Sequence, residues 1–198
     1  MPKPLQNFIV LHSTVSTSPQ VVAWTLVIVA DSESVGVVRL VQISLGPLGL
    51  VAAAARLFLL PRYRVPANQS RIRLGPVSTG LLLFGIGFVV VLRAVPQSLV
   101  AELLGTSWAM ATSVIIPLGL TRALNLSSIP AQALLASRRL EKQVSLARSA
   151  NMTGSVLVIS ILGIMGRDLS EMLQAVLGVQ FASFVYTAYL ANRAGDRT

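Results

Sequence analysis

The chain has 198 residues, of which 54% are hydrophobic and 12% are charged, with a mean hydropathy of +0.73 and a formal net charge of +9. Soluble domains rarely combine so many apolar residues with so few charges, so the composition indicates an integral membrane protein. The sequence contains no cysteine, which excludes disulfides, thiolate metal ligands and a cysteine nucleophile.

Six stretches are apolar enough to cross about 30 Å of hydrocarbon as a helix, which takes roughly 20 residues. Their apolar runs are continuous rather than alternating, which favours helices over membrane β-strands. We therefore predict an all-α fold, a polytopic bundle that forms one transmembrane domain over residues 1–198. The predicted helices span residues 5–30, 32–60, 77–93, 106–136, 142–165 and 169–192.

The first predicted helix, 5–30, begins like a secretory signal because Lys3 precedes apolar residues. It also contains Gln6, Asn7 and His12, and it has no obvious small-residue cleavage site. We therefore interpret it as a membrane helix rather than a signal peptide.

The second predicted helix contains Arg39 within an otherwise uncharged stretch. A charge inside a span costs roughly 2.5 to 3.5 kcal/mol on insertion scales, so it usually faces a cavity or a partner. Gln42 follows one helical turn later on the same face. We predict that Arg39 and Gln42 bind substrate, with Arg122 of the fourth helix as a further candidate. The alternative for Arg39 is that its side chain extends to the outer membrane interface.

The second and fourth predicted helices are interrupted near mid-membrane by Pro47 and Pro117, each close to a glycine. Paired breaks of this kind are typical of transporters, so we predict that both prolines act as hinges. The alternative is that prolines are simply common in membrane helices. Between them, the third predicted helix contains Gly80, Gly85 and Gly87, which would let another helix approach closely.

The basic residues predict an orientation, because six helices place both termini on the same side of the membrane. By the positive-inside rule that side is cytoplasmic, which predicts a multi-pass protein of the plasma membrane. The opposite side holds only Arg93 and Arg167, and Arg39 lies within a helix. The other 13 of the 16 basic residues belong to the cytoplasmic set: Lys3, Arg56, Arg62, Arg64, Arg71, Arg73, Arg122, Arg138, Arg139, Lys142, Arg148, Arg193 and Arg197.

The positive charge does not predict binding to nucleic acid, because short loops next to the membrane account for nearly all of it. These loops instead predict contact with anionic membrane lipids. The sequence has no paired carboxylates within a span, no zinc-ligand spacing, no phosphate-binding loop and no nucleophile elbow. We therefore expect no enzymatic activity, no catalytic residue, no cofactor and no metal site.

Two regions resemble a known family: residues 36–48 with 59–62, and residues 103–108 leading to 116–120. Together they are similar to the C-terminal lobe of bacterial polysaccharide and lipid-linked oligosaccharide flippases of the multidrug/oligosaccharidyl-lipid/polysaccharide exporter superfamily. Such flippases have two six-helix lobes around a central cavity. The resemblance implies that this chain is a half-size flippase that acts on a lipid-linked sugar by alternating access.

A single lobe implies a partner, either a second six-helix lobe or another copy in a homodimer. Two alternatives remain for the function: a non-transporting scaffold or accessory subunit of a cell-envelope glycan assembly complex, and an inactive remnant of a full-length flippase. Cation-coupled drug export, as in the related multidrug branch, is less favoured because the acidic residues all lie at the ends of the predicted spans, where none could bind a cation in mid-membrane.

Overall fold

A computed structural model of the chain describes residue 25 and residues 32–63, 74–96, 108–138 and 140–195. Every regular element within these ranges is an α-helix, which confirms the predicted all-α class. Apart from residue 25, the predicted helix 5–30 lies outside the described residues. The helices are α2 (Ser32–Ser44), α3 (Gly46–Tyr63), α4 (Leu74–Ala94), α6 (Trp108–Ser127), α7 (Ile129–Ser137), α8 (Glu141–Ile164) and α9 (Leu169–Gly195).

Four helical stretches of the described ranges are long and apolar enough to cross a membrane. They are Leu74–Ala94, Ala111–Ser137, Lys142–Ile164 and Leu169–Ala194, and the bent pair α2–α3 would add a fifth if it is counted as one span. These stretches correspond closely to the last five predicted helices. The continuous apolar runs therefore located the helices well.

The two predicted proline breaks differ in local structure. The chain bends by 51° between α2 and α3. The turn between these two helices is closed by a hydrogen bond from Leu48 N–H to Leu45 O at 3.1 Å. Pro47 is the second residue of α3. A backbone N–H at this position has no hydrogen-bond partner within the helix, so a proline, which lacks the N–H, breaks no helical hydrogen bond there. Pro117 is buried inside α6, and Ala111–Ser137 continues through it as one span.

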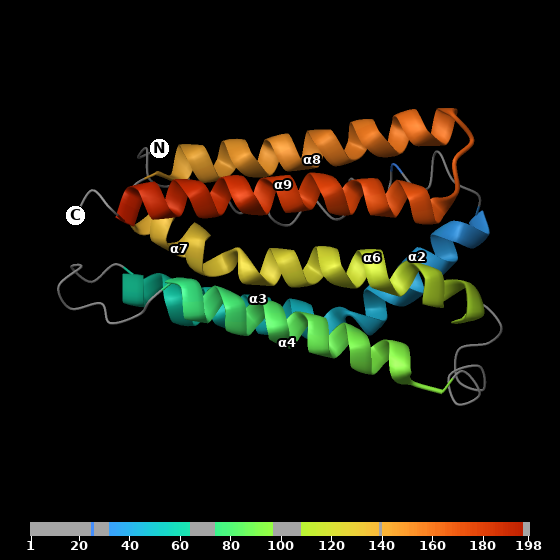
Figure 1. Cartoon of the computed structure of the whole chain (residues 1–198), viewed down its shortest axis with the longest axis horizontal. Coiled ribbons are helices and arrows are strands. Elements are labelled where there is room, and N and C mark those ends of the chain that lie inside the picture. Colours follow the sequence, from blue (N-terminus) through green and yellow to red (C-terminus); the bar gives the residue numbers. More distant parts are fainter. Residues whose placement is uncertain (1–24, 26–31, 64–73, 97–107, 139, 196–198) are drawn as a thin grey trace, which may run out of the picture.

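The helices form an elongated bundle in which α6 and α7 occupy the centre (Figure 1). The helix α8 packs on α9, α4 and α9 both pack on α6, and α3 packs on α7. In the most apolar part of Ala111–Ser137, 67% of the residues are buried, against 11% to 22% in the other three candidate spans. The core accordingly centres on leucine and isoleucine side chains of α6 and α7 that are at most 1% exposed: Ile115, Leu126, Ile129 and Leu135.

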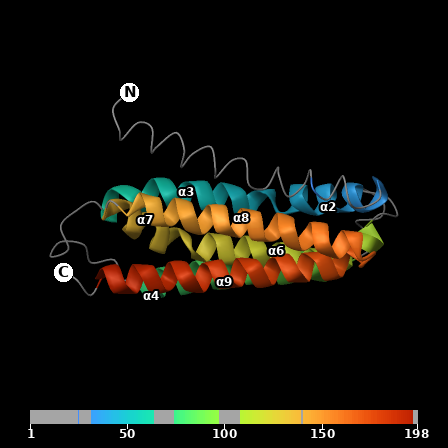
Figure 2. The same ribbon diagram turned by 90° about the horizontal axis from the view of Figure 1, so that it is seen from above.

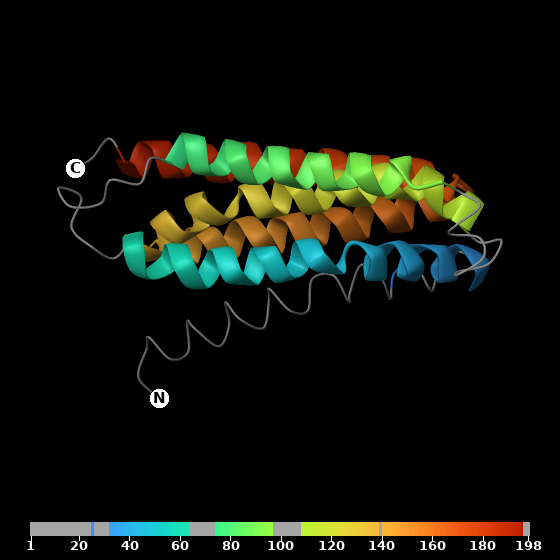
Figure 3. The same ribbon diagram turned by 90° about the horizontal axis from the view of Figure 1, so that it is seen from below.

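Counting α2–α3 and α6–α7 as one segment each, successive segments of the bundle run in opposite directions, so their turns gather at two ends (Figure 1). Figures 2 and 3 show the bundle from opposite sides. At the α7 end lie the last turns of α3 and α9 and the first turns of α4 and α8 (Figure 1). At the Gly166 end, α8 turns back into α9 at Gly166, whose φ of 67° suits a glycine. A polar residue can therefore be assigned to one end by its place along its helix.

Two glycines permit the close approach of α4 and α6. A Cβ atom on Gly85 would lie 2.7 Å from Ala123 Cβ, and one on Gly119 would collide with Val89. The prediction of a small-residue contact is thus confirmed at Gly85. A Cβ on Gly80 or Gly87 would meet nothing within 4 Å in the described part of the chain.

Candidate functional site

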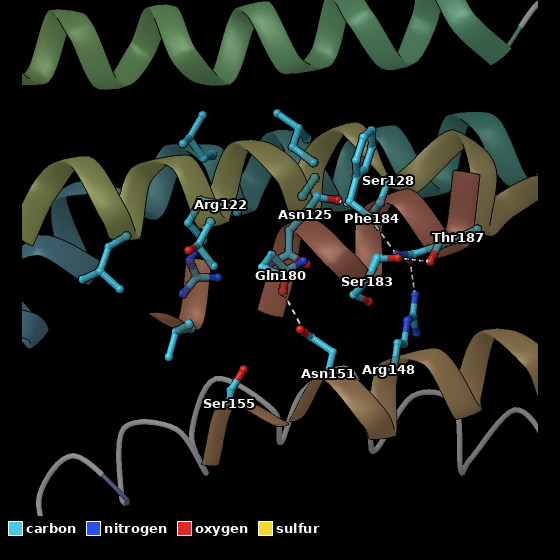
Figure 4. A pocket seen from close by; sticks show the side chains of 18 of the residues that line it. Arg122, Asn125, Ser128, Arg148, Asn151, Ser155, Gln180, Ser183, Phe184 and Thr187 are labelled. Carbon is cyan, nitrogen blue, oxygen red and sulfur yellow. Dashed lines mark hydrogen bonds between the residues drawn. The ribbon is translucent and has the colours of Figure 1, made fainter. Parts of the chain in front are cut away.

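A groove of about 250 Å³ lies between α2–α3, α6–α7, α8 and α9 (Figure 4). We call it the central groove. Leucine and valine side chains such as Leu48, Leu118 and Val176 form the apolar part of its wall. Its polar and charged lining residues are Gln42, Arg56, Thr121, Arg122, Asn125, Ser128, Gln132, Arg148, Asn151, Ser155, Gln180, Ser183 and Thr187.

The polar lining residues recur at helical spacing, which brings each set to one face of its helix. Arg148, Asn151 and Ser155 are spaced by three and four residues along α8. Gln180, Ser183 and Thr187 have the same spacing on α9 and, like the α8 set, line the groove. A period near 3.6 residues turns such positions to a common side, so each helix presents a polar stripe to the groove.

Three arginines line the groove: Arg56 of α3, Arg122 of α6 and Arg148 of α8. Among the lining residues, which all belong to the described ranges, none is acidic. Arg56 is exposed, whereas Arg122 and Arg148 are partly buried. The charges of Arg56 and Arg148 repel each other. A cleft lined by uncompensated positive charge attracts anions, because the surrounding apolar protein focuses its field.

Arg148 is held in place from α7. One of its terminal nitrogens, Nη2, donates a hydrogen bond to Gln132 Oε1. Gln132 Nε2 donates in turn to Ser128 Oγ at 2.8 Å. The other terminal nitrogen, Arg148 Nη1, is buried and has no hydrogen-bond partner within the described ranges. An unpaired buried charged donor is costly, so a ligand that accepts its hydrogen bond would be favoured.

Three side-chain amides cross from α6 through α9 to α8, and we call them the amide chain. Gln180 Nε2 donates to Asn125 Oδ1 at 2.7 Å, and Asn151 Nδ2 donates to Gln180 Oε1 at 2.7 Å (Figure 4). Gln180 is buried, with 6% of its surface exposed. Asn151 Oδ1 has no partner in the described part of the chain. The amide chain therefore joins three helices and keeps one free acceptor.

The structure places the predicted site residues in different surroundings. Gln42 and Arg122 line the central groove, whereas Arg39 is exposed on α2 and is not a lining residue. Pro47 and Pro117 do not line the groove either, although the next residue after each of them does. The groove thus brings together two of the three predicted binding residues.

The charge pattern led the sequence analysis to miss two groove residues. It counted Arg56 and Arg148 only in the cytoplasmic charge set and did not identify them as binding residues, although both lie within helices and line the groove. It also singled out none of the amide chain. The spacing of Arg148, Asn151 and Ser155 along one apolar stretch is the signal that would have indicated a polar face.

Comparisons of the chain with known protein families, with curated proteins and with solved structures find no match. The chemistry of the groove is therefore the feature of the molecule that bears on its function. The regular structure of the described residues is entirely helical and includes helices long and apolar enough to cross a membrane, and the groove gives this bundle a cluster of cationic and amide groups in its interior.

Proposed function

We propose that this chain is a half-size flippase-like membrane protein that takes part in translocating lipid-linked polysaccharide precursors across the plasma membrane. The observation that carries this proposal is the set of three arginines in a groove whose lining, in the described helices, includes no acidic residue. The phosphate groups of such precursors are anions, and arginine binds phosphate with a planar fork of donors. The sequence resemblance to one flippase lobe points to the same substrate class.

The proposed topology has six membrane helices with both termini and the α7 end on the cytoplasmic side. Four basic residues lie near the α7 end within the described ranges: Arg62, Arg138, Lys142 and Arg193. Near the Gly166 end, Arg93 and Arg167 are accompanied by Asp168 and Glu171. The positive-inside rule counts lysine and arginine near the ends of spans, so this distribution favours a cytoplasmic α7 end.

The volume of the groove favours a headgroup rather than a whole lipid-linked sugar. Its 250 Å³ falls just below the roughly 300 to 1,000 Å³ of pockets that enclose drug-sized ligands. A phosphate group fits this space, whereas the sugar and lipid need a larger cavity. We therefore propose that a second six-helix lobe, or a second copy of this chain, completes the translocation cavity.

The test is to replace the groove arginines in cells whose surface polysaccharide depends on this gene. Arg122→Gln and Arg148→Gln remove charge from the groove, and Arg167→Gln removes an exposed charge from the Gly166 end as a matched control. We expect lipid-linked precursors to accumulate and surface polysaccharide to fall for the groove variants alone. Normal polysaccharide in both groove variants, at wild-type protein abundance, would contradict the proposal.

A second candidate function is a non-transporting scaffold or accessory subunit of a glycan assembly complex. It is favoured by Gly80 and Gly87 of α4, which are exposed and have room for a closely packed partner helix. Crosslinking from Gly80→Cys and Gly87→Cys distinguishes the two functions. Partners that are only glycan-assembly enzymes, together with active groove-arginine variants, would support the scaffold function.

A further inference from the structure

The central groove changes character along the bundle axis. Arg122 and Arg148 lie on opposite sides of the amide chain, with Ser155 on the side of Arg122 and Ser183 and Thr187 on the side of Arg148 (Figure 4). Arg148 is nearer the α7 end, because it lies in the first third of α8. We call the part of the groove next to the α7 end the outer part, and the part on the other side of the amide chain, toward the middle of the bundle, the inner part. These two names refer to the bundle and not to the sides of the membrane.

The two arginines lie at different levels along the groove, on opposite sides of the amide chain (Figure 4). Arg148 is bonded to Gln132 of α7, which is ten residues after Arg122 of α6, and ten helical residues correspond to a backbone advance of about 15 Å at 1.5 Å per residue. A hydrogen bond between a guanidinium and a phosphate oxygen is only about 2.7 to 2.9 Å long. An anion at Arg148 must therefore move along the groove to reach Arg122.

We infer that the groove contains two successive positions for an anionic headgroup, an outer one at Arg56 and Arg148 and an inner one at Arg122, separated by the amide chain as a gate. This inference rests on the proposed function in taking the phosphate of a lipid-linked sugar as the anion that moves. The outer position has a free donor in Arg148 Nη1. At the inner position, Ser155 lies on the same side of the amide chain as Arg122 (Figure 4).

The amide chain is suited to opening because its bonds are neutral and few. Two hydrogen bonds, Gln180 to Asn125 and Asn151 to Gln180, hold it across the three helices. Hydrogen bonds between membrane helices are individually weak, so breaking two of them costs little. An arriving phosphate can accept from the same amide N–H groups, so opening the chain exchanges partners instead of leaving donors unpaired.

The absence of cysteine from the sequence makes labelling of single introduced cysteines the direct test. Ser183→Cys reports on the outer part of the groove and Ser155→Cys on the inner part, and each replaces a lining serine with a residue of similar size. The full chain is extracted in detergent together with any partner that co-purifies. The probes are a negatively charged sulfonatoethyl methanethiosulfonate and its positively charged trimethylammonium counterpart.

We expect the cysteine at 183 to react at least about tenfold faster than the one at 155, and both to prefer the anionic reagent, on the order of tenfold. Gln180→Ala should accelerate the inner cysteine about tenfold and leave the outer one within about twofold. Gln174→Ala is the matched control, because Gln174 is an exposed glutamine of the same helix. Arg148→Gln should lower the charge preference at 183, and Arg122→Gln that at 155.

Equal native rates at the two cysteines would overturn the inference, and so would an equal acceleration of both by Gln180→Ala, which would indicate general loosening. A charge preference at 155 that responds to Arg148→Gln as strongly as to Arg122→Gln would contradict separate positions. These results are independent of translocation in cells. A two-position labelling pattern with normal precursor export in arginine variants would remove the flippase assignment and keep the two anion positions.

Discussion

Gly85 of α4 packs directly against Ala123 of α6, so that a Cβ atom on Gly85 would lie 2.7 Å from Ala123 Cβ and 2.9 Å from Ala123 Cα. One of these two atoms belongs to the backbone of the central helix, which cannot move aside as the tip of a flexible side chain can. Most of the other α4 residues face outward, and Gly85 and Val89 are its buried positions. The contact of α4 with the bundle therefore depends on the missing side chain at Gly85.

The first prediction concerns this contact. Gly85→Ala should lower the free energy of unfolding by about 1 to 3 kcal/mol, the usual range for overpacking a close-packed contact. Gly87→Ala is the control on the same helix, because its Cβ would meet nothing within 4 Å, and it should change stability little. Unfolding in mixed detergent micelles, followed by circular dichroism, measures both. Equal effects of the two substitutions would contradict the contact.

The second prediction concerns the coupling of α6 and α9 through the amide chain. Gln180→Ala and Asn125→Ala both remove the 2.7 Å hydrogen bond between the two residues, so their effects on stability should not add. A double-mutant cycle should give a coupling free energy of about 0.6 to 1.7 kcal/mol. Pairing Asn125→Ala with Gln174→Ala provides the control, which should give no coupling because Gln174 is bonded to Ser170.

The helices could be predicted closely from the sequence, and part of the groove could not. Continuous apolar runs placed the spans from residue 32 onward, because hydropathy alone decides which stretches prefer hydrocarbon. Hydropathy does not show which neighbours a polar face meets. Arg39, Arg56 and Arg148 interrupt apolar sequence in similar ways, but only the last two face the groove. That difference arises from the packing of α3 and α8 around α6 and α7, which a single sequence does not display.

The third prediction ranks the arginines by their place in the structure. Purified protein should bind inorganic pyrophosphate at least about tenfold more weakly at the outer position after Arg148→Gln and at the inner position after Arg122→Gln, because a hydrogen bond to a charged group contributes about 1.5 to 3 kcal/mol. Arg39→Gln should change the affinity less than about twofold, since Arg39 is exposed outside the groove lining. Isothermal titration calorimetry measures all three. An Arg39→Gln variant as weak as Arg148→Gln would overturn the ranking.

The fourth prediction concerns the two prolines. Spin labels at Ile43 and Leu57, both exposed, report the bend between α2 and α3. Pro47→Ala should broaden or lengthen the measured distance distribution, because it removes the fixed start of α3 and lets the two helices join in a straighter path. Pro117→Ala serves as the comparison and should leave this distance unchanged, since Pro117 lies inside α6. Double electron–electron resonance gives both distributions.

The basic α7 end has a consequence for the energy of the proposed transport. With the α7 end in the cytoplasm, an anion that passes from Arg148 toward Arg122 moves from the cytoplasmic side toward the cell exterior, away from the negative interior of the cell. The free energy of each negative charge that crosses the whole membrane in this direction falls by about 2.3 kcal/mol per 100 mV of membrane potential. The membrane voltage itself would then drive the headgroup along the groove, and export would slow when an ionophore collapses that voltage.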